Sequence, residues 1–294
     1  MLELILLPSL LGLGLAIELL SSEKDDTPED DPPVEHTLSE TTASFDGTDA
    51  KDHVQGNALD NYLFGAVGND LLGGHDGDDT LEGGIGDDRL FGSAGNDAGW
   101  GGAGDDRIFL GDGDDTTAAP SGLAQDAGDD FIRGGDGADT LIDTQGNNHI
   151  HGDLGPDTII TIDGLQDDGT LDPKDAGTPD TVHAGYGNDT LIGDDGDILT
   201  GGEGKDSFVV ATALQTPGAP VVVTDFDLRD DLFSLVFMEQ APVDPTVRFT
   251  FDPQSGLIHA AVDNQDVATL SGLTAADIPF IQTYVTTLPE LMET

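Results

Sequence analysis

Aspartates that follow glycines at a fixed distance are the residues of this chain whose type and spacing could do chemistry. From Gly47 onward the sequence repeats every nine residues, and GGIGDDRLF at residues 83–91 shows the unit in full. The fourth residue is usually glycine, and the sixth is aspartate or asparagine in every unit but one. A single turn of this kind would be an ordinary β-turn. A row of carboxylates in strict register beside tight turns instead predicts the binding of hard cations through oxygen ligands.

Sixteen such units are found, in three blocks. The eight units of the first block start at Gly47, Gly56, Gly65, Gly74, Gly83, Gly92, Gly101 and Leu110. The next four follow an insert at residues 119–124 and start at Gln125, Gly134, Asp143 and Gly152. The last four follow an insert at residues 161–174 and start at Asp175, Ala184, Gly193 and Gly201. The unit at residues 193–200 is one residue short.

Each unit predicts a tight turn followed by a short strand. Glycines allow the backbone of the first six residues to turn sharply, and the last three place one apolar side chain between two outward ones. Two units should make one coil, so turns 18 residues apart should be neighbours, as Asp70 with Asp88 and Asp79 with Asp97. The inward residues at the eighth position are Val54, Leu63, Leu72, Leu81, Leu90, Ile108, Ile132, Leu141, Ile150, Ile159, Val182, Leu191 and Phe208.

The charge of the chain indicates what it can bind. With 59 acidic and 9 basic residues, its formal net charge is −50, and only 36% of its residues are hydrophobic. Such a chain repels itself unless cations neutralise the carboxylates. A negative potential also argues against nucleic acid and anionic membrane surfaces as partners. Ca²⁺ accepts six to eight oxygen ligands in a tolerant geometry, whereas Mg²⁺ is stricter, and a nine-residue period cannot supply the 12-residue loop of an EF-hand.

The units at residues 47–209 resemble the RTX (repeats-in-toxin) hemolysin-type calcium-binding repeats of proteins exported by bacterial type I secretion. The resemblance implies an all-β fold, a right-handed parallel β-roll or β-solenoid, that binds multiple Ca²⁺ ions and folds when they bind. It also implies that the sixth-position aspartates are metal ligands: Asp52, Asp70, Asp79, Asp88, Asp97, Asp106, Asp115, Asp130, Asp139, Asp157, Asp180, Asp189 and Asp206.

Several units depart from this pattern, and weak or empty sites are expected there. Asn61 and Asn148 replace the carboxylate, and Gly99 replaces the inward apolar residue. The fourth glycine is replaced by Ala50, Leu59 and Thr178.

The segments outside the repeats predict three further parts. Residues 1–20 are apolar and predict a short N-terminal helix, with a membrane tether, a signal and a packed helix all left open. Residues 21–46 predict a polar linker, and residues 210–294 predict a β-rich C-terminal cap over the last coil. The family resemblance places an uncleaved secretion signal near the C-terminus. It implies the type I secretion machinery as a partner and an extracellular location. A cell-surface or matrix target is a separate hypothesis, based on the outer faces of the roll.

An enzymatic activity is not predicted. The motifs H-E-x-x-H and G-x-S-x-G are absent, as is cysteine. His149 and His151 share an outer face and could contribute to a weak zinc site, but surface histidines are the simpler interpretation. Two functions remain open: an exported structural or adhesion protein, and a calcium-stabilised accessory or truncated part of a secreted protease, lipase or polysaccharide-modifying enzyme.

Overall fold

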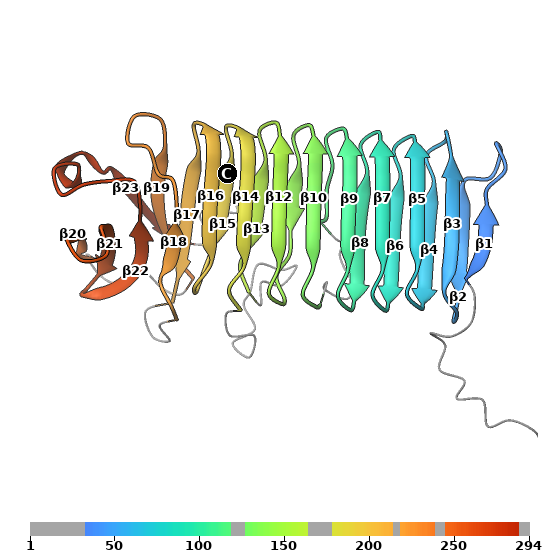
Figure 1. The fold of residues 1–294 in the computed structure, drawn as a ribbon, viewed down its shortest axis with the longest axis horizontal. Helices are drawn as coiled ribbons and strands as arrows, with labels where there is room; N and C mark the ends of the chain where they lie inside the picture. Colours follow the sequence, from blue (N-terminus) through green and yellow to red (C-terminus); the bar gives the residue numbers. More distant parts are fainter. Residues whose placement is uncertain (1–32, 119–126, 164–177, 214–217, 239–244, 288–294) are drawn as a thin grey trace, which may run out of the picture.

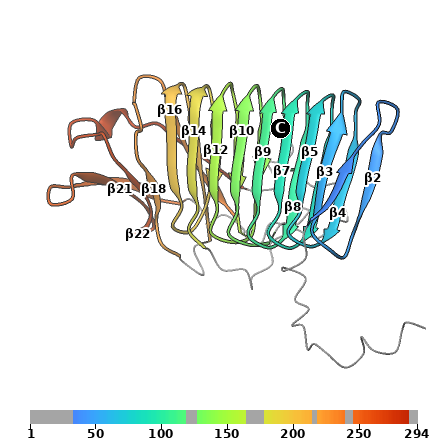
Figure 2. The same ribbon diagram turned by 45° about the vertical axis from the view of Figure 1, so that its right-hand side comes forward.

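The protein is an elongated stack of β-strands (Figures 1 and 2). This computed structural model describes residues 33–118, 127–163, 178–213, 218–238 and 245–287. Within these ranges there is no α-helix, only the 3-10 helix η4 (Ile278–Phe280), and no helix long and apolar enough to cross a membrane. The all-β prediction is confirmed. The helix predicted at residues 1–20, the insert at 119–124 and residues 164–174 of the second insert lie outside the described ranges.

Alternate units contribute their strands to opposite faces of the roll. The first face is one sheet with the order β1 (Val34–Thr37), β3 (Asp52–Asn57), β5 (Leu71–Asp76), β7 (Arg89–Ala94), β9 (Arg107–Asp112), β10 (Phe131–Asp136), β12 (His149–Leu154), β14 (Thr181–Gly187), β16 (Ile198–Gly204), β18 (Val221–Val223), β22 (Gln265–Leu270), β21 (Leu257–Val262) and β20 (Val247–Asp252).

The second face consists of two sheets. One has the order β2 (Ser44–Thr48), β4 (Tyr62–Val67), β6 (Thr80–Ile85) and β8 (Ala98–Ala103). The other has the order β11 (Thr140–Ile142), β13 (Thr158–Thr161), β15 (Thr190–Gly193), β17 (Ser207–Thr212), β19 (Leu232–Phe237) and β23 (Thr283–Thr287). Thr116 joins them, because it bridges Ala98 on one side and Thr140 on the other.

From β1 to β19 the strands of each face pair in parallel and in a register set by the coil. Val54 lies beside Leu72, and Leu72 beside Leu90, so equivalent positions of successive coils stack directly. The inserts do not disturb this alignment, since Ile108 pairs with Ile132 across the first and Ile150 with Val182 across the second. The parallel β-roll that the family resemblance implies is therefore confirmed.

A single column of apolar side chains fills the interior. The predicted inward residues are all at most 1% exposed, so each coil buries about one aliphatic side chain per strand. Gly99 leaves this column empty at one position, which is filled by Leu110, the first residue of the unit that starts one coil later. Its Cδ2 lies 3.0 Å from the point a Cβ of Gly99 would occupy, and Leu110 is fully buried. The departure at Gly99 is thus compensated within the core.

The roll begins earlier than the sequence predicts. The segment assigned above to a polar linker, residues 21–46, contains all of β1 (Val34–Thr37) and the first three residues of β2 (Ser44–Thr48). These strands pair with β3 and β4. Phe45 lies beside Leu63 and packs against the core. These residues keep the coil spacing but lack most of the glycines, which is why the repeat pattern does not reveal them.

At the C-terminal end, parallel pairing gives way to antiparallel pairing. Strands β18 and β19 continue the two faces, and β23 adds to β19. Strands β20, β21 and β22 form an antiparallel meander that joins the first face where β22 pairs with β18. Phe226 and Phe233 extend the interior column as larger side chains. This β-rich unit caps the roll (Figure 1).

Candidate calcium sites

The sixth-position side chains lie inside the turns, at both edges of the roll. Each of the thirteen predicted ligand aspartates is at most 2% exposed. This burial is unusual, because a carboxylate removed from water needs strong partners to remain ionised. The partners of its two oxygens therefore determine what the turn can bind.

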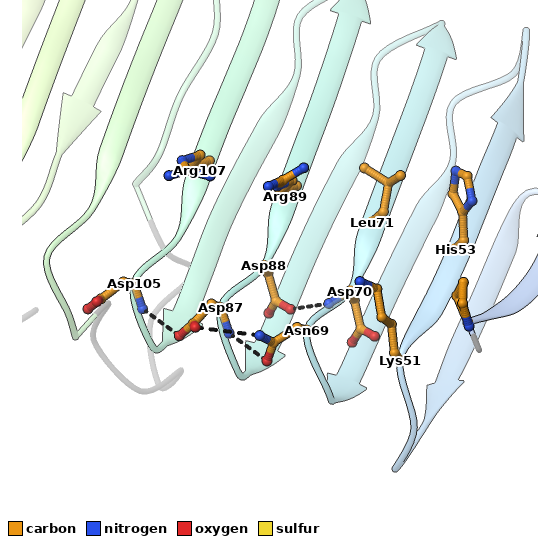
Figure 3. A pocket seen from close by; sticks show the side chains of 11 residues that line it. Lys51, His53, Asn69, Asp70, Leu71, Asp87, Asp88, Arg89, Asp105 and Arg107 are labelled. Carbon is orange, nitrogen blue, oxygen red and sulfur yellow. Dashed lines mark hydrogen bonds between the residues drawn. The ribbon is translucent and has the colours of Figure 1, made fainter. Parts of the chain in front are cut away.

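In twelve of the thirteen aspartates, all but Asp52, one carboxylate oxygen accepts a hydrogen bond from the backbone of the neighbouring coil. The Oδ1 atom of Asp88 accepts a hydrogen bond from the backbone N–H of Asp70 at 2.7 Å (Figure 3). Likewise, Oδ1 of Asp97 accepts one from the backbone N–H of Asp79 at 2.8 Å. Both predicted neighbour pairs are confirmed. One ladder of such bonds joins residues 52, 70, 88, 106, 130, 148, 180 and 197. The other joins residues 61, 79, 97, 115, 139, 157, 189, 206 and 231.

The second oxygen points into the turn, toward the first glycine of its own unit. A Cβ on Gly65 would lie 2.5 Å from Oδ2 of Asp70 and 2.5 Å from the carbonyl oxygen of Gly83 in the next coil. Glycine is needed here because any side chain would fill the space that these two oxygens share. The Oδ2 atom is buried without a hydrogen-bond partner at Asp70, Asp79, Asp97, Asp115, Asp139, Asp157, Asp180 and Asp189.

The raised pKa values of these carboxyls indicate that their ionised forms lack a positively charged partner. Burial raises the pKa of Asp79, Asp115 and Asp157 from 3.8 to about 7, even though a backbone N–H opposes the shift. For Asp180, burial and then the charge of Asp197 raise the pKa to about 9. A cation placed among them would favour the ionised form and remove this penalty.

Fifth-position residues form another ladder, which the sequence pattern does not reveal. Oδ1 of Asp87 accepts from the backbone N–H of Asp105, and Oδ1 of Asn69 accepts from Asp87 (Figure 3). These side chains lie outside the turn, and Asp87 and Asp105 are exposed. The frequent occurrence of Asp and Asn at the fifth position was the sequence signal that could have predicted this ladder. Turns with Asp or Asn at the fifth position are thereby held by one buried and one outer side-chain ladder.

The donor set fits a hard cation held largely by the backbone. No three His, Asp or Glu side chains in the described residues converge as a metal-binding group, which leaves the histidine pair of β12 without support as a zinc site. Instead, one carboxylate oxygen meets backbone carbonyls in each turn. Glycine-rich turns with φ near +134°, as at Gly86, bring such carbonyls close together. Carbonyl and carboxylate oxygens in a tolerant arrangement are the preference of Ca²⁺.

Comparison with known families agrees with this geometry. Residues 46–81, 73–108, 82–117, 126–159 and 177–208 match the family model of the RTX calcium-binding nonapeptide repeat. Residues 46–208 of the chain belong to the RTX calcium-binding repeat family. The repeats of this family bind calcium, so calcium is a partner of the RTX roll. No curated protein sequence matches the chain.

The ladders of the RTX roll include two aspartates that the repeat pattern missed. Asp197, in the short unit, accepts from the backbone N–H of Asp180 and so occupies the sixth position after a one-residue deletion. Asp231 lies beyond the repeats and accepts from Asp206. The segment DLF at residues 231–233 imitates the end of a repeat, which was the available signal.

Some ladder positions have both side-chain oxygens engaged by the protein. Oδ2 of Asp52 accepts from the backbone N–H of Thr48, and its Oδ1 lies 3.3 Å from His36. Oδ2 of Asp197 accepts from the Thr161 hydroxyl and from a backbone N–H. At Asn148 an amide nitrogen stands where the second oxygen would be. The ladder of Oδ1 hydrogen bonds thus includes more positions than those whose Oδ2 atom lacks a hydrogen-bond partner.

Proposed function

We propose that the buried sixth-position aspartates are calcium ligands and that calcium binding folds the roll of an exported structural or adhesion protein. The observation that carries the proposal is the buried Oδ2 atom without a hydrogen-bond partner, repeated at eight positions of the two ladders. Asp70, Asp88 and the other aspartates predicted above would supply carboxylate oxygen. The first-position carbonyls of the next coil would supply backbone oxygen.

Calcium would supply the stabilisation of the roll that the small apolar interior cannot provide alone. One aliphatic residue per strand buries little surface, and the carboxylates of adjacent turns repel one another. Ion binding would cancel this repulsion, so the free energy of binding becomes free energy of folding. We expect the roll to be unfolded in strong chelator at neutral pH.

Export follows from the same coupling. Extracellular calcium modules bind at roughly 10⁻⁴ to 10⁻³ M, so a roll of this kind would stay unfolded in a calcium-poor cytoplasm and fold outside. Proteins with RTX repeats are typically exported. We therefore propose secretion by the type I machinery, with a signal near the C-terminus and a cell-surface or matrix target.

We propose a non-enzymatic role. No observation in the described residues favours the alternative, a calcium-stabilised part of a secreted enzyme. Screening the calcium-loaded protein for protease, lipase and polysaccharide-modifying activity tests that alternative directly.

Circular dichroism and isothermal titration calorimetry on the full chain test calcium-dependent folding. Adding Ca²⁺ to the chelated protein should produce β-structure together with binding, whereas Mg²⁺ at the same concentration should not. The variant Asp97→Ala should weaken binding, and Asp76→Ala, which removes an exposed carboxylate, is its control. Equal β-structure with and without chelator at neutral pH would refute coupled folding.

A further inference from the structure

The outer surface of the first face carries positive charge on a strongly acidic chain. Its outward positions include the seventh and ninth residues of alternate units. We call these residues on β3, β5, β7, β9, β10, β12 and β14 the basic face. No acidic residue occurs at these positions. Second-position residues border the same surface, among them Asp153, which pairs with Arg133. The basic residues of the basic face are His53, Arg89, Arg107, Arg133, His149, His151 and His183. Three of the five arginines of the chain thus lie on one surface.

Two of these arginines have no partner within the described residues. Arg89 and Arg107 are exposed and adjacent in the parallel register, and neither forms an ion pair or a side-chain hydrogen bond there. Two adjacent guanidinium groups repel each other and add nothing to the fold by themselves. Arg133, in contrast, forms an ion pair with Asp153. The unpaired arginines therefore point to an external anion.

Aromatic rings run through the same surface in a row across five strands. Phe91 and Phe109 stack with ring centroids 5.2 Å apart and planes 6° apart. Phe131, His151 and His183 continue the row at centroid separations of 5.6, 5.5 and 5.2 Å. Phe91 is 38% exposed although its ring is apolar. A row of partly exposed rings offers flat apolar surface to a ligand that extends along the roll.

A hollow of about 540 Å³ borders the basic face at the turns. His53, Arg89 and Arg107 lie in a row along its strand side, as Figure 3 shows. Asp87 and Asp105 lie in a second row on the turns. The guanidinium groups of Arg89 and Arg107 thus offer hydrogen-bond donors on the strand side of the hollow, and the two carboxylates offer acceptors on the turn side, beside Lys51.

We propose that the basic face binds an acidic polysaccharide that carries carboxylates on its sugar rings. Arginine pairs with planar carboxylates through two parallel hydrogen bonds. Sugar hydroxyls can donate to Asp87 and Asp105, and the apolar faces of sugar rings can stack on the row of rings. Strands lie about 4.8 Å apart, which is close to the length of one sugar ring. Successive coils can therefore meet successive sugars.

Nucleic acid fits the same surface less well. Bases could stack on the rings, but the phosphates would then approach the acidic row of the hollow as well as the arginines. Phosphate supplies no hydroxyl donors for those carboxylates. Sugar chains that bear both carboxylates and hydroxyls match both rows.

Binding of an acidic polysaccharide would identify the target of the exported protein, and it rests on the proposed function, because the basic face forms only when calcium folds the roll. It is tested by calorimetric titration of short oligogalacturonates into the full chain in calcium, with folding checked by circular dichroism in the same buffer. The double variant Arg89→Gln/Arg107→Gln should bind on the order of tenfold more weakly. Its control, Arg229→Gln/Arg248→Gln, removes equal charge away from the basic face and should bind like the parent.

Four outcomes would overturn the proposal while leaving calcium-dependent folding intact. They are absence of oligogalacturonate binding to the folded chain, equal losses in the two double variants, equal binding of a neutral cello-oligosaccharide, and preference for poly(U) or dextran sulfate. If the chain failed to fold in calcium, the proposed function itself would fail. Phe91→Ala should also weaken binding, and the salt dependence of its binding should remain that of the parent.

Discussion

Replacing Asp79 with asparagine should change the calcium-free and calcium-bound rolls in opposite directions. Asparagine keeps an Oδ1 atom that can accept the 2.7 Å hydrogen bond from the backbone N–H of Asn61, so the ladder is preserved. It removes the buried charge at Oδ2. The ladder and the charge are thereby tested separately.

The size of the effect follows from the raised pKa of Asp79. A pKa of about 7, against 3.8 in the unfolded chain, means that the ionised form at pH 8 costs up to ~4 kcal/mol. We halve this to about 2 kcal/mol, because solvent at the edge of the turn screens the charge. The calcium-free roll of Asp79→Asn should be more stable by that amount at pH 8. Its calcium affinity should fall on the order of tenfold, or about 1.4 kcal/mol.

Both quantities are measurable on the full chain. Folding in chelator can be driven by trimethylamine N-oxide, which favours burial, and the midpoint should move to lower osmolyte for Asp79→Asn. Calcium titration followed by circular dichroism should show a higher midpoint. Asp76→Asn removes an exposed charge from the same unit and should change both midpoints little. Loss of stability in chelator, or an equal calcium effect from Asp76→Asn, would refute the reasoning.

Three further predictions concern pH, a turn and the core. Because burial raises the carboxyl pKa values to about 6 to 9, the calcium-free roll loses stability as pH rises from about 4 through 9. Chelated protein should therefore gain β-structure by circular dichroism when acidified from pH 8 to 5, and unchanged spectra would contradict this. Gly86→Ala places a Cβ 1.9 Å from the carbonyl oxygen of Gly68, so denaturant unfolding in calcium should show a loss at least about 2 kcal/mol larger than for Gly256→Ala. Gly256 also has positive φ, but it has no atom within 4 Å of its Cβ position, so equal losses would exclude the close contact as the cause. Leu110→Gly should lower the free energy of unfolding by about 3 kcal/mol in the same assay. The double variant Leu110→Gly/Gly99→Leu should recover stability, and failure to recover would show that Leu110 does not fill the gap left by Gly99.

The sequence predicts the interior of the roll because the same contact, between eighth-position side chains of successive coils, repeats along it. The nine-residue period fixes which residue points inward, and the coil of two units fixes its neighbours, as with Leu72 and Leu90. The buried ladder follows from the same two facts. Any residue defined by its position in the unit could therefore be placed before the structure was known.

Features that depend on length changes or on missing glycines could not be predicted in this way. Val34 and Phe45 enter the roll through strand pairing alone, since their segments lack most of the glycines. Asp197 takes its ladder position because a deletion shifts it by one residue, so counting from the unit start fails there. The basic face was visible in principle. Its arginines occur in alternate units, but a positional average over all units hides that alternation.

The two oxygens of a ladder aspartate have separate tasks, and Asn148 shows this division. Oδ1 of Asn148 accepts from the backbone N–H of Asp130 at 2.9 Å, as an aspartate would. Its Nδ2 donates to the carbonyl oxygen of Gln145, so an amide supplies positive partial charge to a backbone acceptor of that turn. At Asp70 the corresponding atom is an oxygen without a hydrogen-bond partner. The turns can therefore stack with either aspartate or asparagine, because stacking depends on the Oδ1 atom that both side chains have. The second terminal atom, Oδ2 or Nδ2, determines whether the positive charge in the turn comes from a bound cation or from the protein.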